Sequence, residues 1–202
     1  MDAPSDEKLL HDFVAGDVAG FELLVRRYAA DLFRFATRLT GSSALAEDVV
    51  QESLLKVYLG ASSFDPLRKV RPWLFTVAAN KARDLIRRQE RNREVSFEAY
   101  ADETFEEGGK RFLDLMATDE VGPREELSLE EKRRLVRGII NTMPTHLKEA
   151  LILAYYHHFS YKDLAEILEI QSGTVKSRVH KAITHFGAKY RAAIEGRVEN
   201  DD

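Results

Sequence analysis

The sequence predicts an all-α protein: two small helical domains joined by a flexible acidic linker, with a helix-turn-helix in the C-terminal domain. Two observations lead to this prediction. Apolar residues recur every three or four positions through most of the chain, which is the period of an amphipathic helix, and no alternating strand pattern occurs. Charge is also sorted along the chain. Residues 94–131 carry 3 Lys or Arg against 13 Asp or Glu, whereas residues 132–197 carry 12 against 5.

The first domain, residues 1–93, is expected to contain one short helix and three long ones. The expected helices are 5–15, 21–39, 43–58 and 71–92, with a loop at 61–70. Gly41 and Gly60 follow the first two long helices, where glycine commonly ends a helix. In the second long helix, the predicted inward positions are Ala46, Val50, Leu54 and Val57.

The linker, residues 94–128, has no sustained hydrophobic period. It contains Gly108, Gly109 and Pro123 besides its many carboxylates, a composition that disfavours a packed core. The short apolar run FLDLM at 112–116 is the one place where a helical turn is expected.

The second domain, residues 129–202, begins with a helix at 129–141 and a second from Pro144 to about residue 156. Ser160 and Asp163 have the spacing of a capping box, which opens a short helix through residue 169. After a tight turn, Ser172 is expected to be the N-cap of the last helix. An apolar stripe is expected to dock this last helix onto the short one; it comprises Val175, Val179, Ala182 and Phe186, facing Leu164, Ile167 and Leu168.

A short helix, a turn and a basic helix together form a helix-turn-helix. The polar side chains at the start of the last helix can read base edges in the major groove, while those beside its N-terminus suit a phosphate. The predicted DNA-binding residues are Ser172, Thr174, Lys176, Ser177, Arg178, His180 and Lys181.

Two stretches of the first domain present other surfaces. The helix at 46–58 is predicted to expose an acidic face that also carries a leucine, which favours a basic, partly apolar protein partner over DNA. That face comprises Glu47, Asp48, Gln51, Glu52 and Leu55. Residues 68–93 hold 9 basic and 2 acidic residues, interleaved with aromatic side chains, a pattern typical of surfaces that bind unstacked bases and their backbone.

Together these stretches resemble the bacterial sigma factors of the extracytoplasmic-function (ECF) type, small two-domain members of the sigma factor family. The resemblance covers about residues 8–192. It rests on AEDVVQE at 46–52, RPWLFTVAANKARDLIRR at 71–88 and SYKDLAEILEIQSGTVKSRVHKA at 160–182, in this order.

The resemblance implies a role for each surface. The acidic helix would bind the clamp helices of the polymerase β′ subunit, and the C-terminal helix would read the upstream (−35) promoter element as duplex. The loop at 62–69 and the helix after it would open the downstream (−10) element and hold a flipped base. The matching −10 residues are Phe64, Lys69, Trp73, Asn80, Lys81, Arg83, Arg87 and Arg88.

The resemblance also implies partners. They are core RNA polymerase (clamp helices and β flap), promoter DNA in duplex and single-stranded form, and an anti-sigma factor. Sigma linkers thread the polymerase cleft and RNA exit channel, so the acidic linker is either an RNA mimic or a solvated tether.

Other classes of function find little support in the sequence. The chain has no cysteine and no run of about 18 apolar residues, and its N-terminus is acidic, so we expect a soluble cytoplasmic protein without membrane insertion. The adjacent histidines His157 and His158 point in different directions on a helix, and no metal-ligand spacing or catalytic motif occurs. We therefore expect no metal, cofactor, small-molecule substrate or enzymatic activity.

Two alternatives remain at this point. A stand-alone helix-turn-helix regulator would bind an operator without polymerase, which explains residues 129–192 but not 46–93. A regulatory decoy with a sigma-like fold would bind a partner without opening a promoter, and substitutions at Lys176 or Lys181 would then have no effect.

Overall fold

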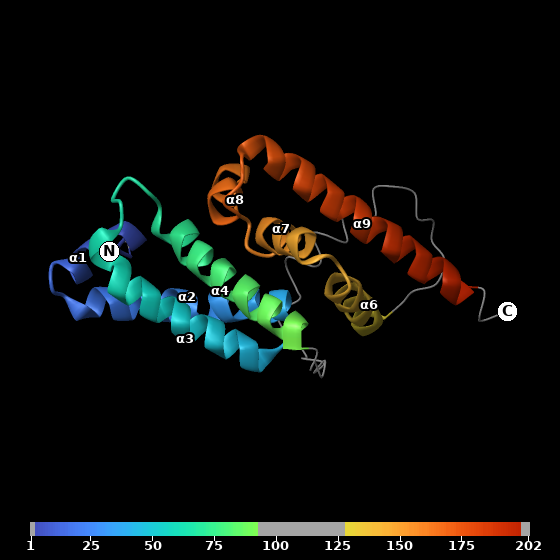
Figure 1. Ribbon diagram of the computed structural model, residues 1–202, viewed down its shortest axis with the longest axis horizontal. Coiled ribbons are helices and arrows are strands. Elements are labelled where there is room, and N and C mark those ends of the chain that lie inside the picture. Colours follow the sequence, from blue (N-terminus) through green and yellow to red (C-terminus); the bar gives the residue numbers. More distant parts are fainter. Residues whose placement is uncertain (1–2, 93–127, 199–202) are drawn as a thin grey trace. The chain divides into compact units, whose positions relative to one another are not determined.

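The computed structural model describes residues 3–92 and 128–198, and all regular structure in these ranges is helical, as predicted. The chain divides into two compact units; α1 to α4 belong to the first, and the second contains α6, α7, α9 and the start of α8 (Figure 1). The predicted linker, with its FLDLM run, lies outside the described residues apart from Ser128. The predicted boundaries at 93/94 and 128/129 therefore stay predictions.

Four α-helices and one short 3₁₀ helix form the first unit. Their bounds are α1 Asp6–Val14, α2 Val18–Thr40, α3 Ser43–Gly60, η1 Ala61–Ser63 and α4 Val70–Asn92. Local chemistry sets the ends: Ser42 Oγ accepts a hydrogen bond from Leu45 N at the start of α3. Gly41 ends α2 in the left-handed conformation, φ 76°, and donates its N–H to Thr37 O.

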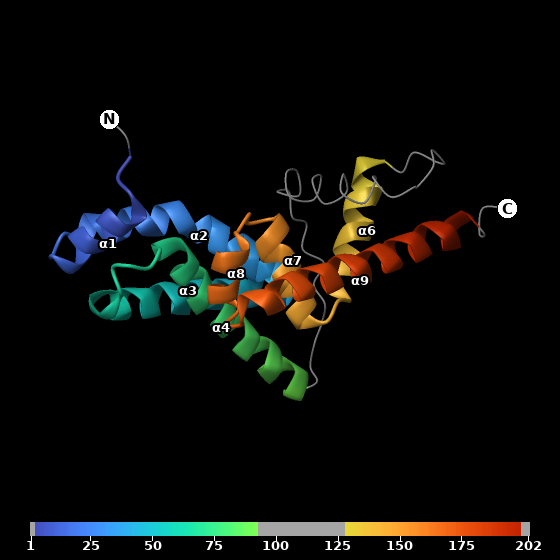
Figure 2. The same ribbon diagram turned by 90° about the horizontal axis from the view of Figure 1, so that it is seen from above.

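Helix α2 is the centre of this unit, because it packs against α1, α3 and α4. Phe35 of α2 meets Phe75 of α4 edge to face, with ring centroids 5.5 Å apart. Leu32 and Phe35 are fully buried, as are Ala78 and Ala82 on α4. Figure 2 shows that the C-terminal end of α4 projects away from α1, α2 and α3 of the same unit, and its cations Arg87, Arg88 and Arg91 are exposed.

The buried face of α3 differs from the prediction. Ala46 and Val57 are buried as expected, but the residues buried between them are Val49 and Ser53. Val50 and Leu54, which were predicted to be inward, are half-buried. Helix α3 packs against both α2 and α4, so its buried stripe is rotated by one residue from the one that the apolar pattern indicates.

A close approach of α1 to α2 requires a glycine. A Cβ atom built on Gly20 would collide with the backbone O of Leu9 and lie 3.2 Å from Phe13 N. Backbone atoms of a packed helix cannot yield as a flexible side chain can, so only glycine fits here.

We expect Gly20→Ala to destabilise the first unit by about 1–3 kcal/mol, because overpacking forces the two helices apart. The measurement is thermal unfolding followed by the fluorescence of Trp73, the single tryptophan of the chain. Gly138→Ala in the second unit is the matched control, since a Cβ there meets nothing within 4 Å. An unchanged midpoint for Gly20→Ala would show that α1 does not pack this closely.

The second unit contains α6 Leu129–Asn141, α7 Thr145–Tyr155 and α9 Ser172–Val198, and α8 Tyr161–Ile167 begins in it. A capping box opens α6, where Ser128 and Glu131 exchange hydrogen bonds. The predicted box at α8 is confirmed: Asp163 N donates to Ser160 Oγ at 3.2 Å, and Ser160 N to Asp163 Oδ2 at 3.4 Å.

Three details of this unit correct the sequence predictions. Helix α8 ends at Ile167, two residues early, because Glu169 adopts a left-handed φ of 53° in the turn. Ser172 is the first residue of α9 rather than its N-cap, and Pro144 precedes α7 instead of lying in its first turn.

The fourth correction concerns the partners of the α9 stripe. Its four residues and the three expected partners on and after α8 are all buried. However, Ala182 and Phe186 belong to a cluster with Val136, Ile139 and Leu151. The C-terminal half of the stripe therefore packs against α6 and α7, the main neighbours of α9.

Candidate nucleic-acid and protein interfaces

The acidic face predicted on α3 is exposed. Glu47, Asp48, Gln51 and Glu52 lie in solvent, and Leu55 beside them is 57% exposed. An exposed leucine among carboxylates offers apolar contact and negative charge together, which suits a basic, partly apolar protein surface.

One residue of the predicted DNA surface does not lie in solvent. Lys81 was expected on an outer flank of α4, but its side chain is only 7% exposed, and its ammonium forms an ion pair with Glu52. The hydrogen bond from Lys81 is the main cause that lowers the pKa of Glu52. Lys81 therefore joins α4 to α3 instead of lying on a solvated flank, and its contact with DNA stays a prediction.

We expect the two partners of this pair to respond differently to substitution. Glu52→Ala leaves the buried ammonium of Lys81 unpaired and should lower the free energy of unfolding by about 1–3 kcal/mol. This is less than for a fully buried pair, because Glu52 is half exposed. Lys81→Met fills the same space without charge and should be close to neutral. Urea unfolding monitored by Trp73 fluorescence measures the free energy of unfolding of both variants. An equal loss of stability in Glu52→Ala and Lys81→Met would contradict this prediction.

The pH dependence of the pair follows from the lowered pKa of Glu52. A carboxyl group with a depressed folded-state pKa stabilises the fold above its unfolded pKa, and this contribution is lost as the pH falls through the folded pKa. The contribution of the pair to stability should therefore be complete at neutral pH and disappear in acid.

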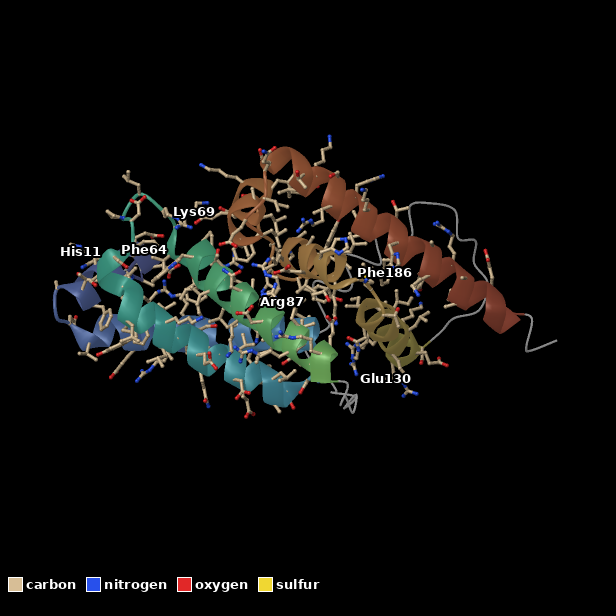
Figure 3. The ribbon with its side chains drawn as sticks, in the orientation of Figure 1. His11, Phe64, Lys69, Arg87, Glu130 and Phe186 are labelled. Carbon is tan, nitrogen blue, oxygen red and sulfur yellow. The ribbon has the colours of Figure 1, made fainter. Side chains whose placement is uncertain are left out.

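Two aromatic rings meet at the start of α4. Phe64, in the loop after η1, lies against Trp73 with ring centroids 4.6 Å apart and planes tilted by 39°. Both rings are half-buried, so each keeps an accessible surface. Figure 3 shows Phe64 and Lys69 on the loop before α4 and Arg87 on the C-terminal half of that helix. An aromatic pair next to cations is a suitable surface for unstacked bases.

The remaining predicted −10 residues lie along α4. Arg83 donates a hydrogen bond to Asn80, which orients both side chains, and Arg87 pairs with Asp84. Lys69, Arg87 and Arg88 are exposed, whereas Asn80 and Arg83 are half-buried. The predicted set thus begins on the loop and continues along α4, with Lys81 as its buried member.

The loop itself is a preformed turn. Asp65 Oδ1 accepts a hydrogen bond from Leu67 N at 2.9 Å, and Asp65 O accepts one from Arg68 N at 3.0 Å. Leu67 lies at the tip with 93% of its surface exposed. The sequence predicted this loop but did not single out Leu67; the Asp-Pro pair before it, a turn signal, was the available indication.

The recognition face of the second unit lies on the first half of α9. Most of its predicted residues are exposed, and only Arg178 is half-buried; the exposed ones are Ser172, Thr174, Lys176, Ser177, His180 and Lys181. Ser177 Oγ donates to Thr174 O at 2.9 Å. The buried Val175 and Val179 set the orientation of this face, which offers cations and hydroxyl groups as a helix in the major groove requires.

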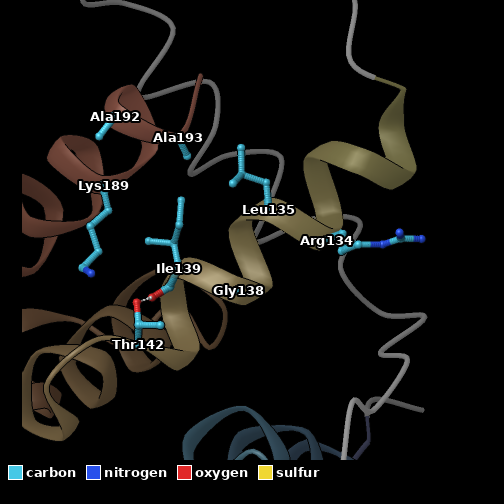
Figure 4. Close-up of a pocket in the computed structure, with 8 residues that line it drawn as sticks. All are labelled: Arg134, Leu135, Gly138, Ile139, Thr142, Lys189, Ala192 and Ala193. Atoms are coloured by element: carbon cyan, nitrogen blue, oxygen red, sulfur yellow. Dashed lines mark hydrogen bonds between the residues drawn. The ribbon is translucent and has the colours of Figure 1, made fainter. Parts of the chain in front are cut away.

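A groove of about 550 Å³ lies between α6 and the second half of α9 (Figure 4). Leu135, Ile139 and two small residues of α9, Ala192 and Ala193, supply its apolar lining. Lys189 is the first residue of α9 that lines the groove. It comes eight residues after Lys181, the last of the predicted DNA-binding residues, which corresponds to about 12 Å along the helix axis. The groove and the predicted DNA-binding residues therefore lie on different parts of α9.

Residues 3–92 and 128–198 contain no group of three or more His, Asp or Glu side chains arranged to hold a metal ion. His157 is buried and His158 exposed, so the adjacent histidines do point apart. In the same two ranges no helix is long and apolar enough to cross a membrane.

The second unit is a helix-turn-helix with a basic recognition face. The first unit adds an acidic face and a loop that is aromatic and basic. This combination is typical of a DNA-binding transcription protein that also has a protein partner. Family models agree: Sigma-70 region 2 matches residues 24–92, and Sigma-70, region 4 matches residues 133–186. The chain is also 32% identical over 197 residues to the ECF RNA polymerase sigma-E factor of Salmonella typhimurium, covering 96% of this chain and 95% of the relative.

Solved structures show the same fold. CnrH, in complex with the cytosolic domain of CnrY, is 22% identical with a TM-score of 0.66, covering 94% of this chain and 99% of CnrH. The sigma factor RpoE of Bartonella quintana, in complex with the anti-sigma factor NepR, is 26% identical with a TM-score of 0.57, covering 85% of this chain and 96% of RpoE. The chain belongs to the sigma-70 family, in its ECF group, and is a transcription initiation factor.

Proposed function

We propose that this sigma factor binds core RNA polymerase through α3, opens the −10 element with the loop before α4 and with α4 itself, and reads the −35 element with α9. One observation carries the proposal: the acidic face, the aromatic loop and the recognition face are accessible at the positions of the three motifs. A stand-alone regulator would need only the second unit.

The division of labour follows from the energetics of DNA opening. Extruding a base from a duplex costs a few kcal/mol, and stacking on an aromatic side chain returns about 1–3 kcal/mol per base. One small unit with the Phe64–Trp73 pair therefore cannot open much DNA alone. When polymerase holds both units, the −10 and −35 contacts become intramolecular and their effects combine.

The assignment of partners follows the same surfaces. The clamp helices of β′ would contact Glu47, Asp48, Gln51 and Leu55, with Glu52 shared with Lys81. The groove between α6 and α9 is the surface of the second unit that best suits the β flap, because its apolar lining accepts a helix. The polymerase would perform the chemistry of RNA synthesis.

Regulation and location complete the proposal. The RpoE structure, solved with the anti-sigma factor NepR, supports a dedicated anti-sigma partner for this chain, which would cover the polymerase-binding or DNA-binding surfaces. Because bacterial promoter DNA lies in the cytoplasm, a cytoplasmic location is part of this proposal. Whether the acidic linker mimics RNA or is only a tether concerns residues outside the described ranges, and both interpretations stay predictions.

Reconstitution tests the proposal. The purified chain is mixed with sigma-free bacterial core polymerase, and the complex is separated by size-exclusion chromatography and assayed for opening of promoter DNA. We expect co-elution with core and opening that depends on both components. Specific binding to duplex DNA by the isolated chain, without affinity for core, would identify an operator-binding regulator instead.

A further inference from the structure

Helix α4, which carries Trp73 and the −10 cations, begins with a contact from the distant helix α1. Glu7 Oε1 accepts a hydrogen bond from Val70 N at 3.2 Å, across 63 positions of sequence. Val70 is the first residue of α4 and is fully buried. The first N–H groups of a helix have no partner within it, and the helix dipole favours a negative charge there. The preceding Lys69 has no acceptor atom with which to cap the helix.

Several independent contacts hold α1, the helix that carries the exposed Glu7, in place. Asp6 accepts hydrogen bonds from Arg27 and from the Tyr28 hydroxyl, both on α2. Leu9 and Leu10 are buried, and the close approach at Gly20 fixes α1 against α2. Helix α1 also packs against η1 and α4, the elements on either side of the −10 loop (Figure 1). The carboxylate is therefore presented from a rigid support.

The contact controls where the aromatic pair forms. Phe64 lies just beyond η1, and Trp73 lies in the first turn of α4, three residues after Val70. The loop between them has its own turn at Asp65, but its end is defined by the start of α4. A shift of that start would move Trp73 relative to Phe64 and disturb their 4.6 Å contact.

We propose that Glu7 is a positioning residue for promoter opening, which caps α4 from α1 and thereby holds the Phe64–Trp73 surface in register. The inference rests on the proposed role of this surface at the −10 element. Glu7 lies outside residues 24–92, the segment that matches the Sigma-70 region 2 model. Helix α1 thus contributes to the DNA surface without contacting DNA.

The test compares Glu7→Ala and Glu7→Gln in the full chain, with Glu22→Ala as the control for loss of an exposed glutamate on α2. Trp73 is the single tryptophan, so acrylamide quenching of its fluorescence reports the local geometry. Affinity for core polymerase and promoter opening by the holoenzyme, measured by permanganate reactivity of thymines, are determined for each variant. Circular dichroism checks that the helices are retained.

For Glu7→Ala we expect more efficient quenching of Trp73 and roughly three- to tenfold less opening, a range typical of a lost helix cap, with unchanged affinity for core. Glu7→Gln keeps an acceptor oxygen and should recover most of the opening, and Glu22→Ala should equal the wild type. Normal quenching and opening in Glu7→Ala would overturn the proposal, as would a parallel loss of core affinity and helix content. If the wild-type chain opened no promoter with core, the proposed function would fail instead.

Discussion

Asp48→Arg is expected to lower the affinity for core RNA polymerase by roughly 100-fold or more, because placing like charges opposite each other in an interface costs several kcal/mol. Asp48 lies in solvent on α3, on the same predicted face as the 57% exposed Leu55, so the substitution meets no packed neighbour. Binding is measured by titrating labelled core polymerase with the variant at two salt concentrations. The loss should be larger at low salt, where exposed charges are less screened.

A matched variant separates charge from position in this experiment. Glu22 is also exposed but lies on α2, and Glu22→Arg makes the same change in net charge. It should retain core affinity within about threefold, since distant exposed charges are largely screened. If Asp48→Arg binds core normally while its helix content is intact, the acidic face of α3 is not the polymerase-binding surface.

Lys181→Ala is expected to relax the preference for one base pair of the −35 element, if its ammonium contacts a base edge. The free energy of binding to that element should weaken by about 1–3 kcal/mol. The side chain is exposed on the recognition face of α9, and truncation should leave the fold unchanged. The measurement is transcription by the reconstituted holoenzyme from promoters that vary one −35 position at a time. If Lys181 contacts only phosphate, transcription will fall evenly across sequences and the salt dependence will weaken.

Lys189→Ala provides the control on the same helix. Lys189 is exposed but lines the groove between α6 and α9 rather than the recognition face. Its loss removes the same charge from α9 and should leave the −35 preference unaltered. A regulatory decoy would show no effect for either substitution, and that result would contradict DNA reading by α9.

Much of the fold could be predicted because the helices carry strong local signals. The left-handed Gly41 and the Ser160–Asp163 box lie where the sequence placed a helix end and a helix start. The errors arise where tertiary packing decides. Helix α3 packs against two long helices, α2 and α4, so Val49 and Ser53 are buried in place of Val50 and Leu54. Glu169 adopts a left-handed φ although it is not glycine, which no residue preference indicates.

The predicted surfaces show the same limit. Helical periodicity predicts that the acidic face and the recognition face are exposed, and the exposure of both is confirmed. Lys81 is different, because a lysine on a helix flank is usually solvated, and only the approach of α3 to α4 brings Glu52 to its ammonium. Glu7 and Val70 lie 63 positions apart, and no local pattern relates a glutamate in one helix to the start of another.

The most direct test of the central claim is transcription from a randomised promoter pool by core polymerase supplied with this chain. A sigma factor with two DNA-reading units should select promoters with two short conserved elements at a fixed spacing, opened at the downstream one. Asp48→Arg should abolish the selection. Retention of specific duplex DNA by the chain alone, with no selection in the presence of core, would contradict the claim and require another partner for the acidic face of α3.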